Sequence, residues 1–445
     1  MILPFQQSKP PGVGFLLVVL SGSLLLGSCT QSDTLGRRYQ TIVATDSPWV
    51  PAAIQAYNRT NPEIPVQVHF SQNLKQDLEN DTIRIDGVIS QNLNYPQAQS
   101  LFADLTGILS DLGSPARYFL QDSLSYSSSE GFPLALPLAY DLPVAVFLHT
   151  PSTSPVPLEG QSIFETWSFE IEDFRSRSQS FSVRTDDRYT RLGYYPGWDR
   201  EFLLCLSRLS GANFMADPTI EARLSWDSPG LNQVLEKVRT WQGDGGPNPD
   251  QIEEFNRRFA YAPWYRQILD NRVAYRVVRL SEFLALPSEY RSRLQFRWIT
   301  ADGRVPVAEN PVYFFLSHNA ESTLGVSNFV RWLVSPEGVS QVLETWIDNG
   351  QIGIQFLGGI PIDLRDPVQP REETSWEKVY YQGIELPPNA RLSFPPTAPA
   401  QWESIIEEVI LPWLREEMRN SQETGSPDNR LTKALEGWQK LYRQE

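Results

Sequence analysis

Between residues 39 and 89, short segments patterned as strands alternate with segments patterned as helices, and this alternation limits the fold more than any other feature. The strands are expected at 39–44, 66–70 and 83–89, with helices between them, the first starting at Ser47 and Pro48 and ending at Asn61 and Pro62. Strands joined by helices form right-handed βαβ units, so the pattern predicts an α/β lobe that binds ligands beyond the carboxyl ends of its strands. Asp46 and Gln91 fall at such ends.

A second constraint is the long extended segment 131–148. It carries Pro133, Pro137 and Pro143 among apolar residues, which excludes a regular helix. A long extended segment of this kind often passes from one lobe of a protein to another.

Apolar residues at helical spacing predict the elements of the remaining chain. Helices are expected at 199–210, 229–241, 326–333, 339–346, 402–413 and 431–442. Ser335 and Pro336 form a helix start signal, and Pro412 is expected to interrupt the helix around it.

The N-terminal segment has the pattern of an export signal. Residues 12–28 are apolar, follow Lys9 and end in Leu26, Gly27 and Ser28 directly before Cys29. Small residues before a cysteine resemble the bacterial lipobox, which implies a lipoprotein signal peptide at 1–28, acylation of Cys29 and a tether at 29–38. An uncleaved signal anchor, or an ordinary signal peptide with a cysteine by chance, are the alternatives.

Composition narrows the class of protein. The chain has 445 residues, which predicts two or three domains, and its 38 Lys and Arg against 53 Asp and Glu give a net charge of −15. Phosphate binding requires clustered basic residues, so the acidic balance argues against nucleic acid as a partner. A hydrophobic content of 41% and a charged content of 20% indicate a globular body.

The common catalytic signatures are missing from the sequence. It contains no P-loop, HExxH, GxSxG or CxxC motif, and its three histidines, His69, His149 and His318, are far apart. We therefore predict no catalytic residues, no metal site and no cofactor. Cys205 lies in an apolar helical segment and is interpreted as a small buried hydrophobic residue.

The aromatic content of 13 Trp, 17 Tyr and 22 Phe suits a pocket in which flat rings stack on sugars. Most of these rings are expected to fill cores. Those near loops or element ends are the candidates for ligand contact: Trp49, Tyr140, Trp198, Trp264 and Trp402.

Several segments in sequence order resemble the bacterial extracellular solute-binding proteins of ABC importers, family 1, the maltose-binding-like group. These segments are 53–62, 85–89, 136–144, 310–317, 327–338, 358–361 and 431–435. The first three are similar, in that order, to the family's first helix ending before Asn-Pro, its third strand with an Asp and the passage into the second lobe. The last four are similar, in that order, to the return to the first lobe, the following helix pair, a Gly-x-x-Pro turn and the terminal helix.

This resemblance implies a two-lobe periplasmic-binding-protein type II fold, of the α/β class, with mixed and parallel sheets flanked by helices and a ligand cleft between the lobes. Lobe 1 would comprise 39–140 and 305–350, and lobe 2 would comprise 141–304 and 351–445. The ligand-binding residues expected by position are Asp46, Trp49, Gln91, Tyr140, Trp198, Arg279, Gly359 and Trp402.

One segment departs from the family pattern. The ligand-facing strand of the second lobe usually follows a Gly and an Ala-Met pair, whereas the corresponding residues 271–279 carry neither that Gly nor a Met. This departure leaves the ligand contacts of the strand, including Arg279, in question.

The resemblance implies a monomeric, lipid-anchored protein at the outer face of the cytoplasmic membrane or in the periplasm. It would capture a small solute, a carbohydrate by preference, through lobe closure and deliver it unchanged to ABC permease subunits. The alternative is a surface or sensor-partner lipoprotein that retains the binding fold without transport. An exported hydrolase is a third hypothesis.

Overall fold

The computed structural model describes residues 40–81, 83–112, 131–150, 166–217, 223–241, 243, 246–349, 359–362, 387, 391–419 and 426–442. The chain divides into a unit at 1–38 and a compact unit at 39–445. The predicted signal peptide, Cys29 and the tether lie outside the described residues.

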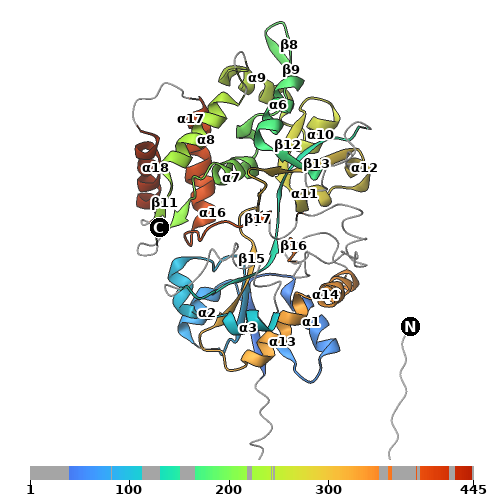
Figure 1. Ribbon diagram of the computed structural model, residues 1–445, viewed down its shortest axis with the longest axis vertical. Helices are drawn as coiled ribbons and strands as arrows, with labels where there is room; N and C mark the ends of the chain where they lie inside the picture. The colour runs from blue at the N-terminus through green and yellow to red at the C-terminus, as the bar shows by residue number, and fades with distance from the viewer. Residues whose placement is uncertain are drawn as a thin grey trace, which may run out of the picture. The chain divides into compact units, whose positions relative to one another are not determined.

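A mixed seven-stranded sheet organises what we call the first lobe (Figure 1). Its strands are β1 (Thr41–Thr45), β2 (Val66–Phe70), β3 (Gly87–Ser90), β4 (Phe102–Ala103), β5 (Leu136–Tyr140), β15 (Val312–Ser317) and β16 (Ile360–Pro361). The order is β16-β5-β15-β3-β1-β2, and β4 pairs with β15 beside this path. β1 pairs in parallel with β2 and β3, which confirms the alternation of strands and helices predicted from the sequence.

The helices of the first lobe are α1 (Val50–Thr60), α2 (Leu74–Asn80), the 3₁₀ helix η2 (Pro96–Leu101), α3 (Thr106–Leu112), α13 (Thr323–Leu333) and α14 (Pro336–Asp348). Ser335 caps α14 as predicted, because its hydroxyl accepts the Gly338 N–H. The predicted start of α1 at Ser47 is wrong. Ser47 begins a turn in which its own carbonyl accepts the Val50 N–H. The N-cap position of α1 is Trp49.

The second lobe is built on a four-stranded sheet in the order β12-β6-β13-β7. Its strands are β6 (Pro143–Leu148), β7 (Ser168–Glu170), β12 (Tyr275–Arg279) and β13 (Leu294–Thr300). The extended segment predicted from its prolines forms β5 of the first sheet and β6 of the second, with only Asp141 and Leu142 between them. β15 returns the chain to the first sheet at the segment expected for that return.

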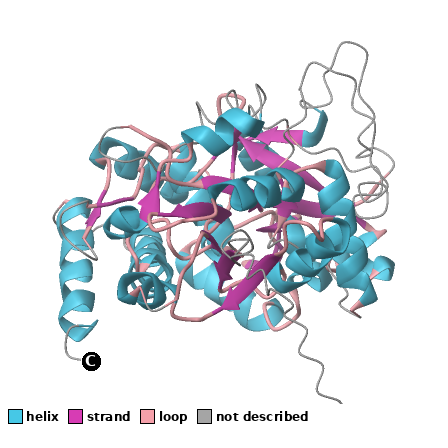
Figure 2. Ribbon diagram, turned by 90° about the horizontal axis from the view of Figure 1, so that it is seen from below, coloured by secondary structure: helices cyan, strands magenta, loops and turns pink. Residues whose placement is uncertain are grey.

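Helices flank the strands of both sheets (Figure 2). Those of the second lobe are α6 (Ile171–Phe181), η4 (Pro196–Trp198), α7 (Arg200–Leu209), α8 (Ser228–Thr240), α9 (Pro249–Phe259), α10 (Trp264–Leu269), α11 (Leu280–Leu284), α12 (Ser288–Arg291), α16 (Trp402–Ile405), α17 (Leu411–Arg419) and α18 (Pro427–Tyr442). Two-stranded pairs complete it: β8 (Val183–Thr185) with β9 (Arg188–Arg191), β10 (Met215–Ala216) with β11 (Leu224–Ser225), and β14 (Val305–Pro306) with β17 (Leu392–Ser393). β16 pairs with β5 of the first sheet, although the sequence analysis assigned residues 351–445 to the second lobe. The lobe boundaries expected from the sequence remain a proposal.

The expected interruption at Pro412 takes the form of a wider helical turn. α16 continues through a π-helical segment, Ile406–Ile410, directly into α17, which contains Pro412. Proline lacks the N–H that an α-helix requires, and a π turn ahead of it accommodates the lost hydrogen bond. The apolar stripe of the segment therefore stays on one buried face, from Trp402 to Trp413.

Cys205 lies in the core of the second lobe with 3% of its surface exposed, as predicted from its apolar neighbours. Burial raises the pKa of its thiol to about 12. Within the described part of the chain, no helix has both the length and the apolar character needed to cross a membrane.

The burial of Cys205 predicts a thiol that is inert in the folded protein. A Cys29→Ser variant leaves Cys205 as the single cysteine. At pH 8 about one thiol in 10⁴ would be ionised, so a chromogenic disulfide reagent should give no release over hours in buffer and one equivalent within minutes in guanidinium chloride. Rapid labelling of the native variant would contradict the buried position.

Candidate functional site

A pocket forms where three distant segments of the chain meet. One segment follows β3, the second precedes and enters β15, and the third precedes and enters α16. The lining residues are Gln91, Asn92, Asn94, Tyr95, Glu309, Asn310, Pro311, Tyr313, Pro395, Pro396, Ala398, Pro399, Ala400, Trp402 and Glu403. The pocket contains about 500 Å³ of space free of protein atoms, part of it open to solvent.

The first-lobe wall of the pocket lies at the carboxyl ends of the parallel strands β1 and β3, as the strand pattern predicted. Asp46 follows β1, and its carboxylate accepts hydrogen bonds from the Ser90 hydroxyl at 2.8 Å and the Asn92 amide at 2.9 Å. Asp46 thereby orients Asn92, which lines the pocket together with Gln91 and Asn94.

The opposite wall is held by Glu309, whose carboxylate is buried. It accepts a hydrogen bond from the Trp402 indole Nε1 at 2.9 Å and forms an ion pair with Arg208 of α7. Arg208 also donates to the carbonyl of Val307, so the guanidinium is fixed to the segment that leads into β15. These bonds fix the indole of Trp402 at the pocket wall.

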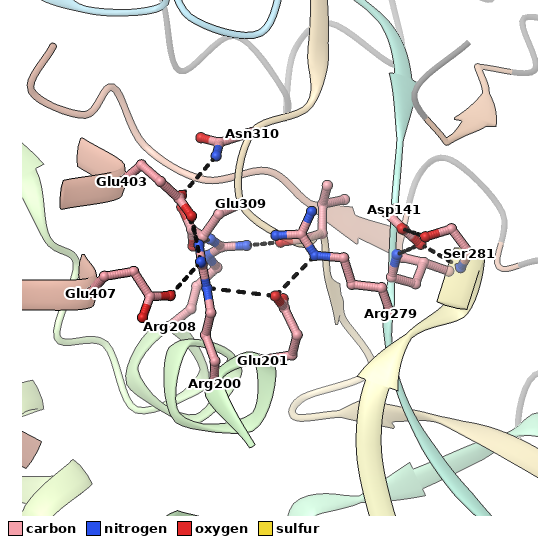
Figure 3. A network of polar contacts seen from close by, with 12 residues as sticks. Asp141, Arg200, Glu201, Arg208, Arg279, Ser281, Glu309, Asn310, Glu403 and Glu407 are labelled. Atoms are coloured by element: carbon pink, nitrogen blue, oxygen red, sulfur yellow. Dashed lines mark hydrogen bonds and ion pairs between the residues drawn. The ribbon is translucent and has the colours of Figure 1, made fainter. Parts of the chain in front are cut away.

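A second carboxylate at the pocket, Glu403, is held by Arg200 (Figure 3). Arg200 Nη2 donates to Glu403 at 2.8 Å, and Asn310 Nδ2 donates to the same carboxylate at 3.1 Å. The hydrogen bond from Arg200 lowers the pKa of Glu403. Glu403 therefore presents an ionised acceptor that a neighbouring cation holds in place.

The ion-pair network continues away from the pocket. Burial disfavours the charged form of Arg200, but Glu403, Glu201 and Glu407 together raise its pKa. Arg279 Nε donates to Glu201 at 2.9 Å. Burial raises the pKa of Glu201, and Arg279 opposes that rise. Figure 3 shows Arg279 lying between Glu201 and the Asp141–Ser281 contact.

The residues expected to contact ligand have different positions in the structure. Gln91 and Trp402 line the pocket, and Asp46 supports it through Asn92. Arg279 is paired with Glu201 and is not among the lining residues. The contacts of these residues with a ligand remain predictions.

Four further expected positions lie elsewhere. Trp49 and Tyr140 are each 2% exposed in the core, where Tyr140 packs against Phe394. Trp198 lines a separate pocket of the second lobe. Gly359 has φ +150°, and a Cβ there would lie 2.3 Å from the carbonyl oxygen of Tyr140, so only glycine permits this approach to β5.

The sequence prediction of the site did not include Glu309, Asn310 or Glu403. Glu309 and Asn310 lie two or three positions before the returning strand β15, and Glu403 follows Trp402. Their positions beside predicted elements were visible, but the chain has 53 acidic residues, and nothing local distinguishes these two carboxylates from the others.

Comparison with known proteins finds solved structures that share the fold of this chain, but no match in sequence. No protein-family model matches the chain, and no curated protein matches it in sequence. A sugar transporter from Rhizobium etli in an open conformation aligns with a TM-score of 0.56 at 15% identity, covering 89% of this chain and 99% of the other. The bacterial solute receptor AcbH aligns with a TM-score of 0.55 at 12% identity, covering 90% and 99%.

A third solved structure agrees with these two. The cyclic α-maltosyl-1,6-maltose binding protein from Arthrobacter globiformis aligns with a TM-score of 0.52 at 13% identity, covering 89% and 97%. The chain has the two-lobe fold of the substrate-binding proteins. The fold class predicted from the sequence is therefore confirmed.

Proposed function

We propose that this chain is an extracytoplasmic solute-binding protein that captures a neutral carbohydrate in the pocket of Gln91, Asn92, Glu309 and Trp402. The observation that carries the proposal is a pocket rich in hydrogen-bonding groups whose carboxylates are each held by an arginine. Glu309 is paired with Arg208 and Glu403 with Arg200. Acceptors that are fixed by ion pairs favour the hydroxyl groups of a neutral ligand over an anion.

The neutral side chains of the pocket suit the same ligand class. The amides of Gln91, Asn92 and Asn94 provide both donors and acceptors for hydroxyl groups. Tyr95, Tyr313 and Trp402 also line the pocket, but they are 4%, 2% and 7% exposed, so the aromatic surface that they offer to a sugar ring is small. In the described part of the chain the pocket offers mainly hydrogen-bonding groups, and we infer that it binds and releases its ligand without reaction.

The named specificities of the structural neighbours support this ligand class. AcbH has an exclusive preference for β-D-galactopyranose, and the Arthrobacter globiformis protein is a cyclic α-maltosyl-1,6-maltose binding protein. A third neighbour, with a TM-score of 0.53 at 12% identity, was solved with mannotriose bound. These specificities belong to those proteins, and they are the reason for testing this chain with a panel of sugars.

The lipobox-like sequence ending at Cys29 supports the further proposal that acyl chains anchor the protein to a membrane. A monomer tethered in this way would release its ligand to ABC permease subunits at the same surface. Metabolic labelling with a fatty-acid analogue should mark the natural chain and leave Cys29→Ser unlabelled. Equal labelling of both would contradict the anchor.

Carbohydrate binding predicts a ligand-dependent rise in stability. A sugar present at about 100 times its Kd should add about 2.7 kcal/mol to the free energy of unfolding. We expect a panel of mono- and oligosaccharides to contain at least one that raises the Tm, and Asn92→Ala to reduce that shift. Asn349→Ala, at the exposed end of α14, is the matched control and should retain the full shift.

A panel in which no sugar raises the Tm would contradict the carbohydrate proposal. If peptides, polyamines and oxyanions also failed to raise the Tm, solute capture would be contradicted altogether.

One observation favours the alternative of a sensor-partner lipoprotein. β12 is the strand that departs from the family pattern, and its arginines Arg276 and Arg279 are paired with Asp199 and Glu201. Among the described residues, none of β12 lines the pocket. Affinity purification that recovers a receptor and no permease would support this alternative.

A further inference from the structure

A second pocket lies within the second lobe, at the meeting of η4, α9 and α17. Its walls include Tyr195 and Trp198, Asn256 of α9, and Arg415 and Arg419 of α17. It contains about 450 Å³ of space free of protein atoms, part of it open to solvent. It shares no lining residue with the pocket proposed for carbohydrate.

The two arginines of this pocket differ from six other arginines of the lobe that are held by carboxylates. Arg200, Arg208, Arg239, Arg276, Arg279 and Arg430 each pair with a carboxylate. Arg415 donates to the carbonyl of Gly197 at 3.3 Å, and among the ion pairs of the described residues neither it nor Arg419 has a carboxylate partner. In a chain with a net charge of −15, two such cations in one concave surface require an explanation.

The spacing of the arginines brings their charges together. Residues four apart on a helix lie on the same face, so Arg415 and Arg419 both extend from one side of α17. Tyr195 lines the same pocket. Burial raises the pKa of this phenol, and the positive charges of Arg419 and Arg415 oppose the rise. Two guanidinium groups and a phenol therefore surround one volume.

The facing wall is rigid and adds donors. The Trp198 indole Nε1 donates to Asn256 Oδ1 at 2.8 Å, which leaves the Asn256 amide nitrogen as the donor of that side chain. The Trp198 ring stacks on Phe255, with centroids 6.0 Å apart, and carries the Arg276 guanidinium 5.5 Å from its centre. A wall held on several sides costs little ordering when a ligand binds.

One lining group has the opposite charge. Glu253, on α9, is exposed, and it is the acidic residue among those that line the pocket. The charged side chains of the lining are then two cations and one anion. The remaining positive charge favours an anionic ligand, and the carboxylate of Glu253 opposes it.

We propose that this second pocket binds a free oxyanion, the phosphate or carboxylate group of a small solute, between Arg415 and Arg419. Guanidinium groups bind such planar or tetrahedral oxyanions through paired charge-assisted hydrogen bonds. Tyr195 and Asn256 would donate to the remaining oxygens. Because the site is separate from the carbohydrate pocket, the outcome of its test does not depend on the proposed function.

Titration calorimetry of the full chain with inorganic phosphate at pH 8 tests the proposal, with ionic strength held constant by potassium chloride. We expect saturable binding of one phosphate per chain. Arg419→Gln should weaken it at least about tenfold because a charge-assisted bond is lost, and Glu253→Gln should tighten it several-fold because an opposing charge is removed. Arg257→Gln, on the exposed part of α9 outside the pocket lining, is the control and should bind as the natural chain does.

The opposite responses of Arg419→Gln and Glu253→Gln separate a pocket site from a general charge effect. Arg419 is exposed at the end of α17, so its replacement is compatible with folding, and equal unfolding midpoints of the variant and the natural chain would verify this. Absence of saturable heat in both the natural chain and Glu253→Gln would overturn the proposal. So would equal affinity of Arg419→Gln and the natural chain, or equal weakening by Arg257→Gln.

Discussion

Replacement of Asp86 by alanine is expected to cost about 3–5 kcal/mol of unfolding free energy, because it removes a buried charge from all of its partners at once. The Asp86 side chain is 0% exposed. It accepts hydrogen bonds from the backbone N–H groups of Ile42, Glu321 and Ser322 at 2.8–2.9 Å and pairs with Arg84. Urea denaturation of both proteins measures the difference.

The expected size follows from what Asp86 connects. It lies directly before β3, bonds to β1 and satisfies N–H groups just before α13. Alanine would leave three backbone donors without their acceptor inside the first lobe. Asp348→Ala, an exposed carboxylate at the end of α14, is the control and should change stability by less than about 0.5 kcal/mol. Similar losses in the two variants would contradict this assignment.

The pH dependence of stability gives an independent test of Asp86. Burial acts to raise its pKa, but the bonds from Arg84 and the backbone N–H groups outweigh burial and lower it. A carboxylate whose pKa is lower in the folded protein stabilises the fold above the unfolded value of about 3.9. That stability is lost as the pH falls through the folded pKa. Asp86→Asn should therefore have a shallower loss of stability below about pH 4.

Replacement of Glu309 by alanine is expected to abolish carbohydrate binding and to destabilise the chain by about 3–5 kcal/mol, because Arg208 would keep a largely buried charge without its partner. Trp402 would also lose the acceptor of its indole N–H. Denaturation in urea and calorimetry with the sugar identified by the thermal screen measure the two effects.

A double substitution separates the charge from the packing. Arg208→Met with Glu309→Leu removes both ions and should recover most of the stability lost in Glu309→Ala. Glu407→Ala is the matched control, since this half-exposed carboxylate also pairs with an arginine, Arg200, and should cost less than about 1 kcal/mol. An effect of Glu407→Ala as large as that of Glu309→Ala would contradict the role of burial.

Local patterns were sufficient for most of the elements. β2 has the predicted bounds of Val66–Phe70, and α7 and α8 lie within one residue of their predicted bounds, because side-chain periodicity and turn residues act over a few positions. Two starts were wrong: the strand predicted at 83–89 begins only at Gly87, and α1 begins later than predicted. The Ser47–Pro48 pair is a valid start signal, but Ser47 instead forms the turn that precedes Trp49.

The candidate site was only partly accessible from the same patterns. Gln91 and Asp46 were found because parallel strands place their carboxyl ends at one edge of a sheet, which is a rule that needs only the order of strands and helices. Trp49 satisfied that rule equally well, yet it is buried in the core. Sequence position identifies the edge of the sheet, whereas the direction of each side chain depends on packing.

The sequence by itself determined the α/β class, the long extended segment and the strand ends at which a ligand could bind, since each follows from short-range periodicity and backbone restriction. Only the tertiary structure decided that Glu309 and Glu403, 94 positions apart, meet Gln91 in one pocket, and that Trp198 faces Arg415 and Arg419 in another. Such meetings depend on how the two sheets and their helices pack. That packing sums many weak contacts between distant residues, and no single stretch of the chain encodes it.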